Sequence, residues 1–326
     1  MKNRVEEALE RIAPHIRRTE CRRASALSDE IGGDVRLKLE NLQHSGSFKL
    51  RGVINKILSL SEEDSQKLLV TASTGNHGAA FAHALQLFGL HGKLFMPKTS
   101  AAVKVENVRS TGVPFELVGE DCVEAEAHAA AFAFDNRHIW ISPYNDLEVV
   151  HGQGTVAIEL KEQLDDIDAV LAPVGGGGLM AGVAGYLKAV DPSIEVIGCQ
   201  PVNSCVMYES IKAGEVLDIE SLSTISDGTA GGIEAGAVTF DLCRRYVDSF
   251  VLLQEAEIIA AMRFLHEEEG LTVEGAAALP AAAVLNQRAR FAGRRTVLIV
   301  SGGRVDEATV ARVLESDGNV DREEST

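Results

Sequence analysis

The sequence predicts an α/β protein built on parallel sheets, and three observations support this fold class. Short apolar segments alternate along the chain with amphipathic, alanine-rich segments of roughly 10–15 residues, which indicates βαβ units. The apolar segments are almost continuously hydrophobic, as expected of strands that are covered on both faces of a sheet. Glycine-rich stretches directly follow three of these segments, at the strand ends where open α/β sheets bind ligands.

The expected elements follow one another in a regular order. In the first helix, residues 4–17, apolar side chains recur every three or four positions. Predicted strands lie at 35–39, 68–73, 92–97, 114–119, 138–142, 169–174, 195–199, 250–253 and 296–301. Further helices are predicted at 76–88, 101–111, 120–135, 152–164, 178–190, 255–268, 274–287 and 305–315, with a helix also expected to follow Lys49. The last residues, 321–326, read as a frayed polar tail.

Composition narrows the class of protein. The chain has 326 residues, enough for two domains, and a net charge of -17, which argues against a nucleic-acid partner or an anionic membrane. Its five cysteines include no Cys-x-x-Cys pair, so neither a disulfide framework nor a zinc site is indicated. The amphipathic start is not a secretory signal, and no run of about 18 apolar residues occurs. We therefore expect a cytoplasmic protein.

Four consecutive glycines, residues 175–178, follow a predicted strand and precede a predicted helix. Such a loop lets backbone N–H groups converge on an anion, helped by the helix dipole, although a tight turn without a ligand would have the same pattern. A dinucleotide site would need an acid at the end of the next strand, whereas Glu195 begins that strand. A Walker loop is excluded because no Lys-Ser/Thr follows the glycines. A cofactor with one phosphate monoester fits better.

Two further loops and one lysine are candidates for a site. The stretch 73–78, STGNHG, offers hydroxyls, an amide and helix-start N–H groups that suit a carboxylate, or else it is an ordinary helix cap. Ser301, in SGGR after the last strand, could bond a ring nitrogen or simply form a turn. Lys49, in SGSFKLRG, is either a surface lysine or an amine held for chemistry.

Together these stretches, in this order, resemble the fold-type II (tryptophan synthase beta-like) enzymes that use pyridoxal phosphate. The resemblance is nearest to threonine/serine dehydratases and serine racemase, and it spans roughly residues 10–310. HGQGT (151–155), SDGT (226–229) and VEGAA (273–277) agree with it. It implies two open, parallel-rich α/β domains with the cofactor in the cleft between them. The large domain would comprise 1–55 and 147–326, and the small mobile domain 56–146.

The resemblance also implies roles for individual residues. Lys49 matches the Schiff-base lysine, which also serves as the base that removes the Cα proton, and Phe48 lies beside it. Asn76 matches the contact to the ring hydroxyl and Ser301 the partner of the pyridine nitrogen. The phosphate loop would be Gly175, Gly176, Gly177, Gly178 and Leu179, while Gly228 and Glu274 would line the cofactor pocket. The substrate carboxylate would be held by Ser73, Thr74, Gly75, Asn76 and His77.

The implied activity is ammonia-lyase action on a β-hydroxy amino acid, L-threonine or L-serine, by a homodimer that binds only a small-molecule substrate. The cofactor phosphate would protonate the departing hydroxyl. Racemisation, dehydration of 3-hydroxyaspartate or of an ectoine-derived amino acid, and non-catalytic cofactor binding remain alternatives. The chain ends soon after the last predicted helix, so we expect a catabolic enzyme without a C-terminal regulatory domain.

The sequence departs from the family pattern at several positions. The racemase branch has two carboxylates that hold a divalent cation where this chain has Gln200 and Val206, so no metal site is expected. Thr74 stands where that branch has a serine acting as the opposite-face acid/base. Arg304 replaces the usual Asn after SGG and brings a cation near the ring. Tyr144 and His151 also stand out, and His151 is expected either above the site or as a buried structural histidine.

Overall fold

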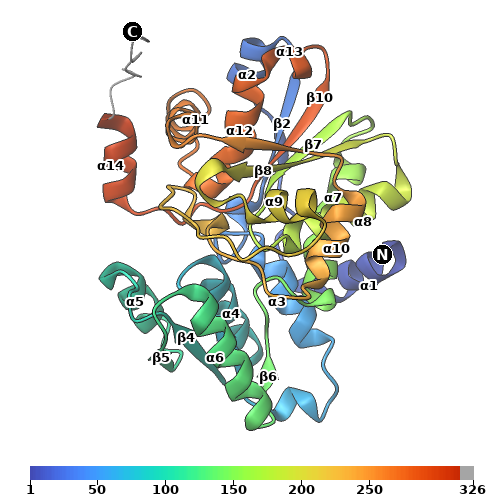
Figure 1. The fold of residues 1–326 in the computed structure, drawn as a ribbon. Helices are drawn as coiled ribbons and strands as arrows, with labels where there is room; N and C mark the ends of the chain where they lie inside the picture. Colours follow the sequence, from blue (N-terminus) through green and yellow to red (C-terminus); the bar gives the residue numbers. More distant parts are fainter. Residues whose placement is uncertain (316–326) are drawn as a thin grey trace.

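The computed structural model describes residues 1–315, so the predicted tail at 321–326 lies outside the described residues. Two separate sheets organise the chain, and each is the centre of one lobe in Figure 1. The larger lobe holds both the beginning of the chain and its second half, and the smaller lobe is formed by the segment between them.

The larger sheet has six strands in the order β1-β2-β10-β7-β8-β9. All neighbouring pairs are parallel except β1 with β2. Strand β10, the last in the sequence, pairs with β2 on one side and β7 on the other, so it lies inside the sheet. The strands are β1 (Cys21–Arg23), β2 (Asp34–Leu39), β7 (Ala169–Pro173), β8 (Glu195–Pro201), β9 (Ser249–Leu253) and β10 (Arg295–Val300).

Helices cover both faces of this sheet. In β7, Val170 and Ala172 point into the core formed with α1, α7, α8 and α10, whereas Ala169 and Leu171 point into the core formed with α2, α11 and α12. Because both faces are buried, every residue of β7 is buried and apolar. This explains why the strands read as continuous hydrophobic segments in the sequence.

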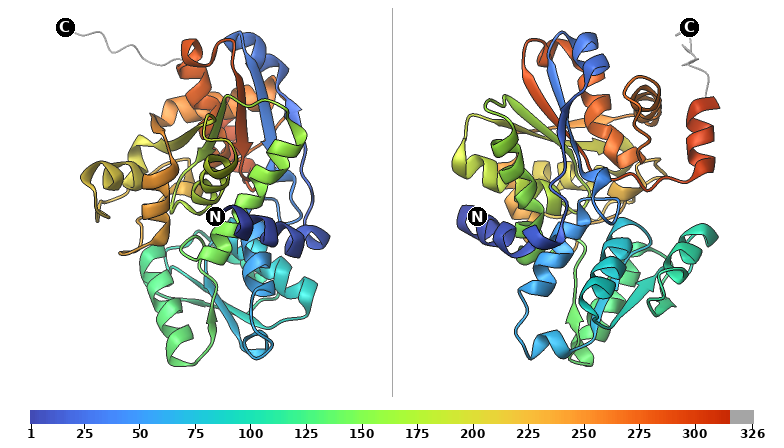
Figure 2. Two further views of the ribbon diagram at one scale, coloured as in Figure 1. Left: turned by 90° about the vertical axis from the view of Figure 1, so that its right-hand side faces the viewer. Right: turned by 180° about the vertical axis from the view of Figure 1, so that it is seen from behind.

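The smaller sheet has four parallel strands in the order β5-β4-β3-β6. Helices α3 and α4 pack on one face, through Leu69 of β3, and α6 packs on the other, through Val70. Helix α3 also packs on α7 of the larger lobe, and Figure 2 shows it at the junction of the two lobes. The strands are β3 (Leu69–Ala72), β4 (Gly92–Met96), β5 (Phe115–Leu117) and β6 (Ile139–Trp140).

The helices agree with the predicted pattern in most places. They are α1 (Lys2–Ile12), α2 (Ser25–Ile31), α3 (Lys49–Leu58), α4 (Asn76–Phe88), α5 (Ala102–Arg109), α6 (Cys122–Asp135), α7 (Leu147–Gln163), α8 (Gly178–Val190), α9 (Val206–Ala213), α10 (Val238–Tyr246), α11 (Glu255–Glu267), α12 (Gly275–Asn286), α13 (Arg288–Phe291) and α14 (Glu307–Glu315). All predicted strands are present, whereas β1 and the helices α2, α9, α10 and α13 were not predicted. Helix α7 begins earlier than predicted because the Asp146 side chain caps the N–H groups of Glu148 and Val149.

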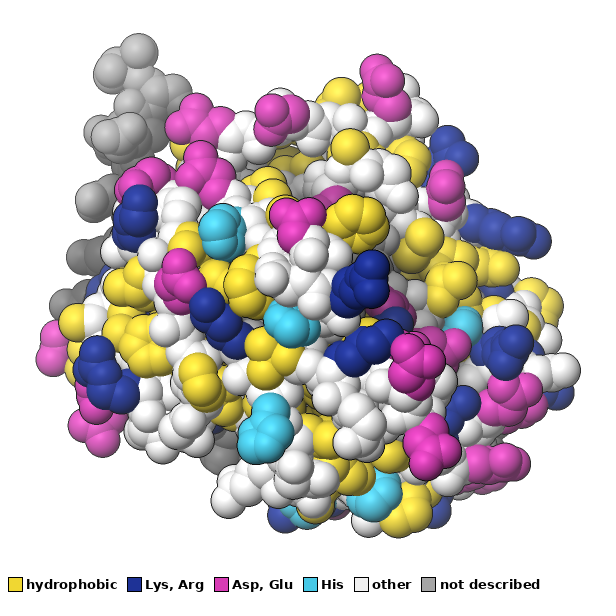
Figure 3. All heavy atoms as spheres, turned by 90° about the horizontal axis from the view of Figure 1, so that it is seen from below, with side chains coloured by type: hydrophobic (Ala, Val, Ile, Leu, Met, Phe, Trp, Pro, Cys, Tyr) yellow, Lys and Arg dark blue, Asp and Glu magenta, His cyan; other side chains and the backbone are white. Residues whose placement is uncertain are grey.

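Two observations concern the helices and the surface charge of residues 1–315. Within residues 1–315, no helix combines the length and the apolar character needed to cross a membrane. On the face shown in Figure 3, acidic and basic side chains are interspersed rather than collected into one patch.

Candidate active site

A cavity of about 690 Å³ lies where the carboxyl ends of strands from both sheets meet. The three glycine-rich stretches noted in the sequence, after β3, β7 and β10, all contribute to its wall. Sites in open α/β sheets lie at this end of the strands. The topology therefore brings together segments that are more than 200 positions apart in the chain.

Lys49 is the first residue of α3, and its amine lines the cavity. The turn before it is tied to the loop after β10, because Ser47 forms a β-bridge with Gly302 and the Phe48 N–H donates to the Ser301 carbonyl at 3.0 Å. Lys49 Nζ donates to the Pro143 carbonyl at 2.9 Å. Burial lowers the pKa of Lys49 to about 8, which the more distant carboxylates only partly oppose.

A close crossing between α3 and α7 fixes the position of Lys49. A Cβ atom on Gly52 would lie 2.3 Å from Gln153 Nε2, and one on Gly152 would lie 2.6 Å from the Arg51 carbonyl oxygen. Glycine at both positions lets the two backbones approach this closely. The start of α3 is therefore held by the larger lobe, although the helix also packs against the smaller sheet.

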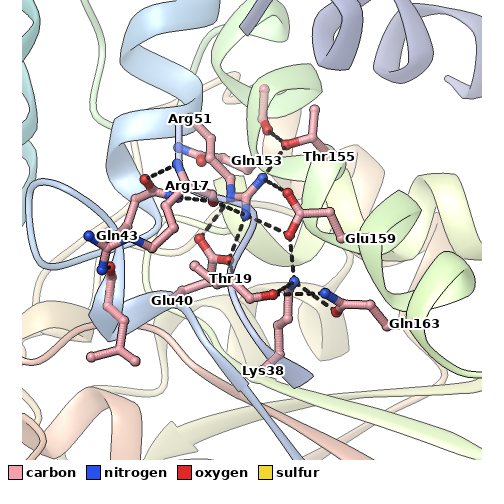
Figure 4. A network of polar contacts seen from close by, with 12 residues as sticks. Arg17, Thr19, Lys38, Glu40, Gln43, Arg51, Gln153, Thr155, Glu159 and Gln163 are labelled. Atoms are coloured by element: carbon pink, nitrogen blue, oxygen red, sulfur yellow. Dashed lines mark hydrogen bonds and ion pairs between the residues drawn. The ribbon is translucent and has the colours of Figure 1, made fainter. Parts of the chain in front are cut away.

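Arg51, two residues after Lys49, points away from the cavity into a four-charge network of Lys38, Glu40, Arg51 and Glu159 (Figure 4). Its guanidinium donates to both Glu40 oxygens at 2.8 Å and to the two Glu159 oxygens at 2.7 and 3.0 Å. Lys38 donates to Glu159, and Thr19 donates to Glu40. All four charges are buried, and each one has a partner of opposite sign.

The four glycines after β7 form a loop with no room for side chains. Gly177 has φ +86°, and a Cβ atom on Gly176 would lie 2.4 Å from the Tyr144 ring. In the part of the chain that the structure describes, the N–H groups of Gly175, Gly176 and Gly177 donate to no protein acceptor. Helix α8 begins at Gly178 and points its N-terminus at the cavity, with Leu179 also in the wall. This is an anion-binding loop in both shape and charge.

Asn76 begins α4 and faces Glu274, the residue before α12. Asn76 Nδ2 donates to Glu274 at 2.7 and 2.9 Å, while Asn76 Oδ1 is buried without a partner among residues 1–315. Burial raises the pKa of Glu274 to about 7, against the opposing hydrogen bond from Asn76. Gly228 and Gly302 approach closely, since a Cβ atom on either would lie within 3.5 Å of Glu274 Oε1.

The loop 73–77 leads into the first turn of α4. Ser73 Oγ accepts the Gly75 N–H at 3.1 Å, and the Thr74 hydroxyl forms no hydrogen bond in the described part of the chain. The His77 ring is buried and lies 2.9 Å from Thr71 Oγ1, and burial lowers its pKa to about 3, so it is neutral at pH 7. The side chain of His77 is thus engaged by the protein, and its backbone N–H remains for a ligand.

Ser301 and Arg304 line the cavity from the loop after β10. Ser301 is buried, and within residues 1–315 its hydroxyl has no protein partner. The aliphatic part of Arg304 lies over the SGSF turn, since a Cβ atom on Gly46 would lie 3.3 Å from Arg304 Cγ. Arg304 therefore lines the cavity beside the SGSF turn, and its place near the cofactor ring stays a prediction.

The residues that departed from the family pattern occupy different places. Tyr144 lines the cavity and packs on the glycine loop. His151 lies on α7 away from the cavity, 3.6 Å from Glu148, so the alternative of a buried structural histidine is the one that the structure shows. Gln200 is buried and accepts the Tyr208 N–H at 2.9 Å. Residues 1–315 contain no cluster of three or more His, Cys, Asp or Glu that could hold a metal ion.

Two acidic residues near the cavity were missed by the sequence analysis. Glu126 lines it from α6, and Glu234 lies nearby in the loop before α10, where its N–H donates to Tyr144 Oη at 2.9 Å. The local pattern distinguishes Glu126 only weakly from the other acidic residues of α6. The only available signal was that a glutamate interrupts the alanine-rich side of that helix.

A family model described as "Pyridoxal-phosphate dependent enzyme" matches residues 12–302. The chain belongs to this family. It is 38% identical over 312 residues to an L-threonine ammonia-lyase of Thermotoga maritima, covering 95% of this chain and 77% of that one. It is also 38% identical over 320 residues to a catabolic L-threonine dehydratase of Staphylococcus aureus, covering 97% and 92%. The family, the fold type and the enzymatic nature expected from the sequence are confirmed.

Solved structures agree with this family membership. Maize serine racemase superposes with a TM-score of 0.88 at 32% identity, covering 95% of both chains. The processed form of threonine deaminase isoform 2 from Solanum lycopersicum gives a TM-score of 0.88 at 32% identity, covering 97% of this chain and 88% of that one. This pyridoxal-phosphate dependent enzyme thus shares its whole fold with enzymes named for both elimination and racemisation.

The cavity fits pyridoxal phosphate on its own chemistry. The group needs an amine, an anion cradle, and polar atoms that can face a ring hydroxyl and a ring nitrogen. Here the cavity offers the Lys49 amine, the unoccupied N–H groups of the glycine loop, the unpartnered Asn76 Oδ1 and the Ser301 hydroxyl. The buried atoms without protein partners lie where a ligand would satisfy them.

Proposed function

We propose that this protein is an ammonia-lyase that converts L-threonine or L-serine into a 2-oxo acid and ammonia. The observation that carries the proposal is the Lys49 amine, which has no paired carboxylate within residues 1–315. It lies in the same cavity as the glycine loop, whose N–H groups donate to no acceptor in the described chain. The relatives named for threonine ammonia-lyase and dehydratase activity cover more than nine-tenths of the chain.

Pyridoxal phosphate, when bound, withdraws electrons from the substrate Cα and so makes its proton acidic. We assign the phosphate group to the N–H groups of Gly175, Gly176, Gly177 and Gly178 and to the start of α8 with Leu179. Asn76 and Ser301 are assigned to the ring hydroxyl and ring nitrogen, and Phe48, Gly228 and Glu274 to the pocket walls. A serine partner leaves the ring nitrogen unprotonated, which favours loss of a β-substituent over transamination.

Lys49 is assigned two tasks. Its amine would hold the cofactor covalently, and as a free amine it would take the Cα proton of the substrate at Nζ. A pKa of about 8 leaves a useful fraction of neutral amine at physiological pH, which an ordinary lysine does not have. The N–H groups at the start of α4, with the loop of Ser73, Thr74, Gly75, Asn76 and His77, bind the substrate carboxylate.

Racemisation is the second candidate, and the free Thr74 hydroxyl in the cavity is the observation that favours it. A racemase needs a proton donor on the face of Cα opposite the lysine, and a hydroxyl in this loop could supply one. Elimination and racemisation differ in their products, so one assay separates them. Formation of the D-enantiomer faster than 2-oxo acid release would favour the racemase assignment.

The same proposal includes the architecture and setting of the enzyme. Residues 1–55 with 147–326 form the large cofactor-binding domain, and 56–146 form the small domain, which closes on substrate. A homodimer is proposed from the resemblance to the family, and a cytoplasmic location from the composition and the N-terminal pattern of the sequence. Analytical ultracentrifugation and limited proteolysis near residues 56 and 146 would check the assembly and the domain limits.

The proposal is tested by measuring 2-oxo acid release from a panel of β-hydroxy amino acids. The panel includes L-threonine, L-serine, 3-hydroxyaspartate and a hydroxylated diamino acid as the ectoine-derived type. Borohydride reduction followed by mass spectrometry should place the cofactor on Lys49. Absence of turnover with both threonine and serine would overturn the substrate assignment. Absence of a Lys49 adduct would leave the non-catalytic alternative.

A further inference from the structure

Glu126 is the one acidic residue that the smaller lobe contributes to the cavity wall among the described residues. It lies on α6, in the same cavity as Lys49 and Tyr144. The other acidic residues of the wall, Asp227, Glu274 and Asp306, all come from the larger lobe. Glu126 thus faces the site from the side that would close over a bound substrate.

Unlike its neighbours, Glu126 has no bonding partner in residues 1–315. Asp227 is paired with Lys104 at 2.7 Å, and Glu274 accepts two contacts from Asn76. Neither a hydrogen bond nor an ion pair engages the Glu126 carboxyl in the described chain, although the residue is half-buried. A polar side chain held in a cavity wall without a protein partner is available to a ligand.

The surroundings keep this carboxyl protonated. Burial, helped by the nearby Glu234 and Asp121, raises the pKa of Glu126 to about 8, although Lys49 opposes this shift. Glu234 is itself fixed, because Asn145 Nδ2 donates to it at 3.1 Å. The charged or titratable groups that face Glu126 are Lys49, Asp121, Cys122, Tyr144 and Glu234.

We propose that Glu126 is the general acid that protonates the β-hydroxyl of the substrate as it leaves. This role rests on the proposed ammonia-lyase function, and it replaces the cofactor phosphate that the family resemblance implied for this step. Glu126 lies in the cavity wall on the smaller lobe, whereas the glycine loop that we assign to the phosphate lies on the larger lobe. Domain closure would then bring the Glu126 carboxyl to the substrate hydroxyl before that group leaves.

The step balances in atoms and charge. Lys49 Nζ takes the Cα proton, and the electron pair of the C–H bond becomes the Cα–Cβ double bond. The Cβ–O bond breaks with its electrons on oxygen, which takes the proton of Glu126 and leaves as water. Glu126 is left as a carboxylate and Lys49 as an ammonium, so transfer of one proton from lysine to glutamate restores both groups.

The test compares two substrates that differ only in the leaving group. Hydroxide needs a proton to leave L-serine, whereas chloride leaves β-chloro-L-alanine without one. In the holoenzyme, Glu126→Gln should lower kcat/KM for L-serine by about 10²–10⁴-fold, the usual contribution of a general acid. The same variant should change kcat/KM for β-chloro-L-alanine by less than about threefold.

Matched variants separate this role from damage to the fold. Glu124→Gln changes a glutamate of the same helix that does not line the cavity, so both substrates should keep wild-type rates. Glu126→Asp keeps an acid and should recover part of the L-serine activity. In wild type, kcat/KM for L-serine should fall at high pH as Glu126 ionises, and this fall should be absent for β-chloro-L-alanine.

Each result decides the matter. An equal loss with both substrates would assign Glu126 to positioning and overturn the proposal. Unchanged elimination from L-serine would also overturn it and return the acid role to the cofactor phosphate. If the wild-type holoenzyme releases 2-oxo acid from β-chloro-L-alanine but from no β-hydroxy amino acid, the proposed function itself fails, and the role of Glu126 falls with it.

Discussion

Two regions of this molecule bury charged side chains, and they treat them in opposite ways. In the four-charge network, burial alone would raise the pKa of Glu40, yet Arg51 holds it below its usual range, whereas burial still lowers the pKa of Lys38 against the effect of Glu159. In the cavity, burial lowers the pKa of Lys49 to about 8 and raises those of Glu126 and Glu274 to about 8 and 7. The network compensates each charge with a direct partner, whereas the cavity leaves its groups close to the point of gaining or losing a proton.

The difference shows how buried charged side chains that stabilise the fold can be distinguished from those that serve the active site of the same protein. Lys49 and Arg51 lie two residues apart on the same helix, and their pKa values shift in opposite directions. The Arg51 guanidinium meets two carboxylates, while the Lys49 amine meets one carbonyl oxygen. Paired charges stay charged and hold the fold, and unpaired ones can take part in proton transfer.

The strongest test removes the cavity amine. Lys49→Ala should reduce 2-oxo acid release by more than about 10⁴-fold, the upper range of general-base catalysis, because the covalent link is lost as well. Stability of the cofactor-free protein should be unchanged or slightly higher, since a desolvated amine is removed. Steady-state kinetics and urea unfolding measure the two effects. A strong loss of stability would show that Lys49 is a structural residue.

The corresponding test in the network should have the reverse outcome. Arg51→Met leaves Glu40 and Glu159 buried with one lysine between them and should cost about 3–5 kcal/mol of unfolding free energy. Chemical denaturation would report this as a lower midpoint. Lys38→Met should cost less unfolding free energy, because Glu159 would still form its ion pair with Arg51. A variant of Arg51 as stable as wild type would contradict the distinction between the two regions.

Lack of space, rather than charge, limits which residues the anion-binding glycine loop can contain. A Cβ atom on Gly176 would lie 2.4 Å from the Tyr144 ring, so Gly176→Ala should push the loop and weaken pyridoxal phosphate binding. An overpacking cost of about 1–3 kcal/mol corresponds to roughly 5- to 150-fold in Kd. Titration of the cofactor-free protein measures it. Gly214→Ala, at a helix end where φ is +86° and no atom lies near the added Cβ, strains the backbone without touching the loop and so serves as a control for general glycine effects.

The smallest expected effect is a pH dependence of stability with opposite signs in the two regions. In the cofactor-free fold, Glu126 and Glu274 keep their protons at pH values where the unfolded chain has lost them, above about pH 4.5. Their contribution to the free energy of unfolding therefore falls as the pH rises toward 8. Glu40 has a lowered pKa in the fold. Its contribution to stability is therefore lost only as the pH falls below the pKa that Glu40 has in the unfolded chain. Thermal unfolding should show a Tm decrease of a few degrees from pH 5 to 8.5, and a separate decrease as the pH falls below about 4.5 and Glu40 gains a proton. Glu126→Gln should flatten the slope from pH 5 to 8.5.

The sequence predicted the cavity side of this comparison better than the network side. Glycine loops, Lys49 and Asn76 lie in short segments with recognisable residue types, and strand ends in parallel sheets meet at one edge, so their convergence could be expected. The roles given to these residues stay predictions that the experiments above address. Glu126 was missed because its placement depends on how α6 packs across the second sheet, which no local pattern records.

The network shows why local patterns fail for buried charge. The alternation over 35–39 places Lys38 on the face opposite Val35, Leu37 and Leu39, where a solvated side chain is expected. In the fold α7 covers that face, so Lys38 is fully buried against Glu159. Arg51 and Glu40 likewise read as ordinary surface charges. Arg51 and Lys38 both contact Glu159, which lies more than 100 positions further along the chain, and sequence spacing carries no trace of these contacts.

Strand β10 is made last, yet it lies between β2 and β7 and carries the loop that is bridged to Ser47. During synthesis, the turn that presents Lys49 therefore has no partner until residues 295–302 have been translated. At roughly 5–20 residues per second, that interval is on the order of ten seconds or more. We therefore expect the cofactor site to form only after β10 and the loop that follows it have been made.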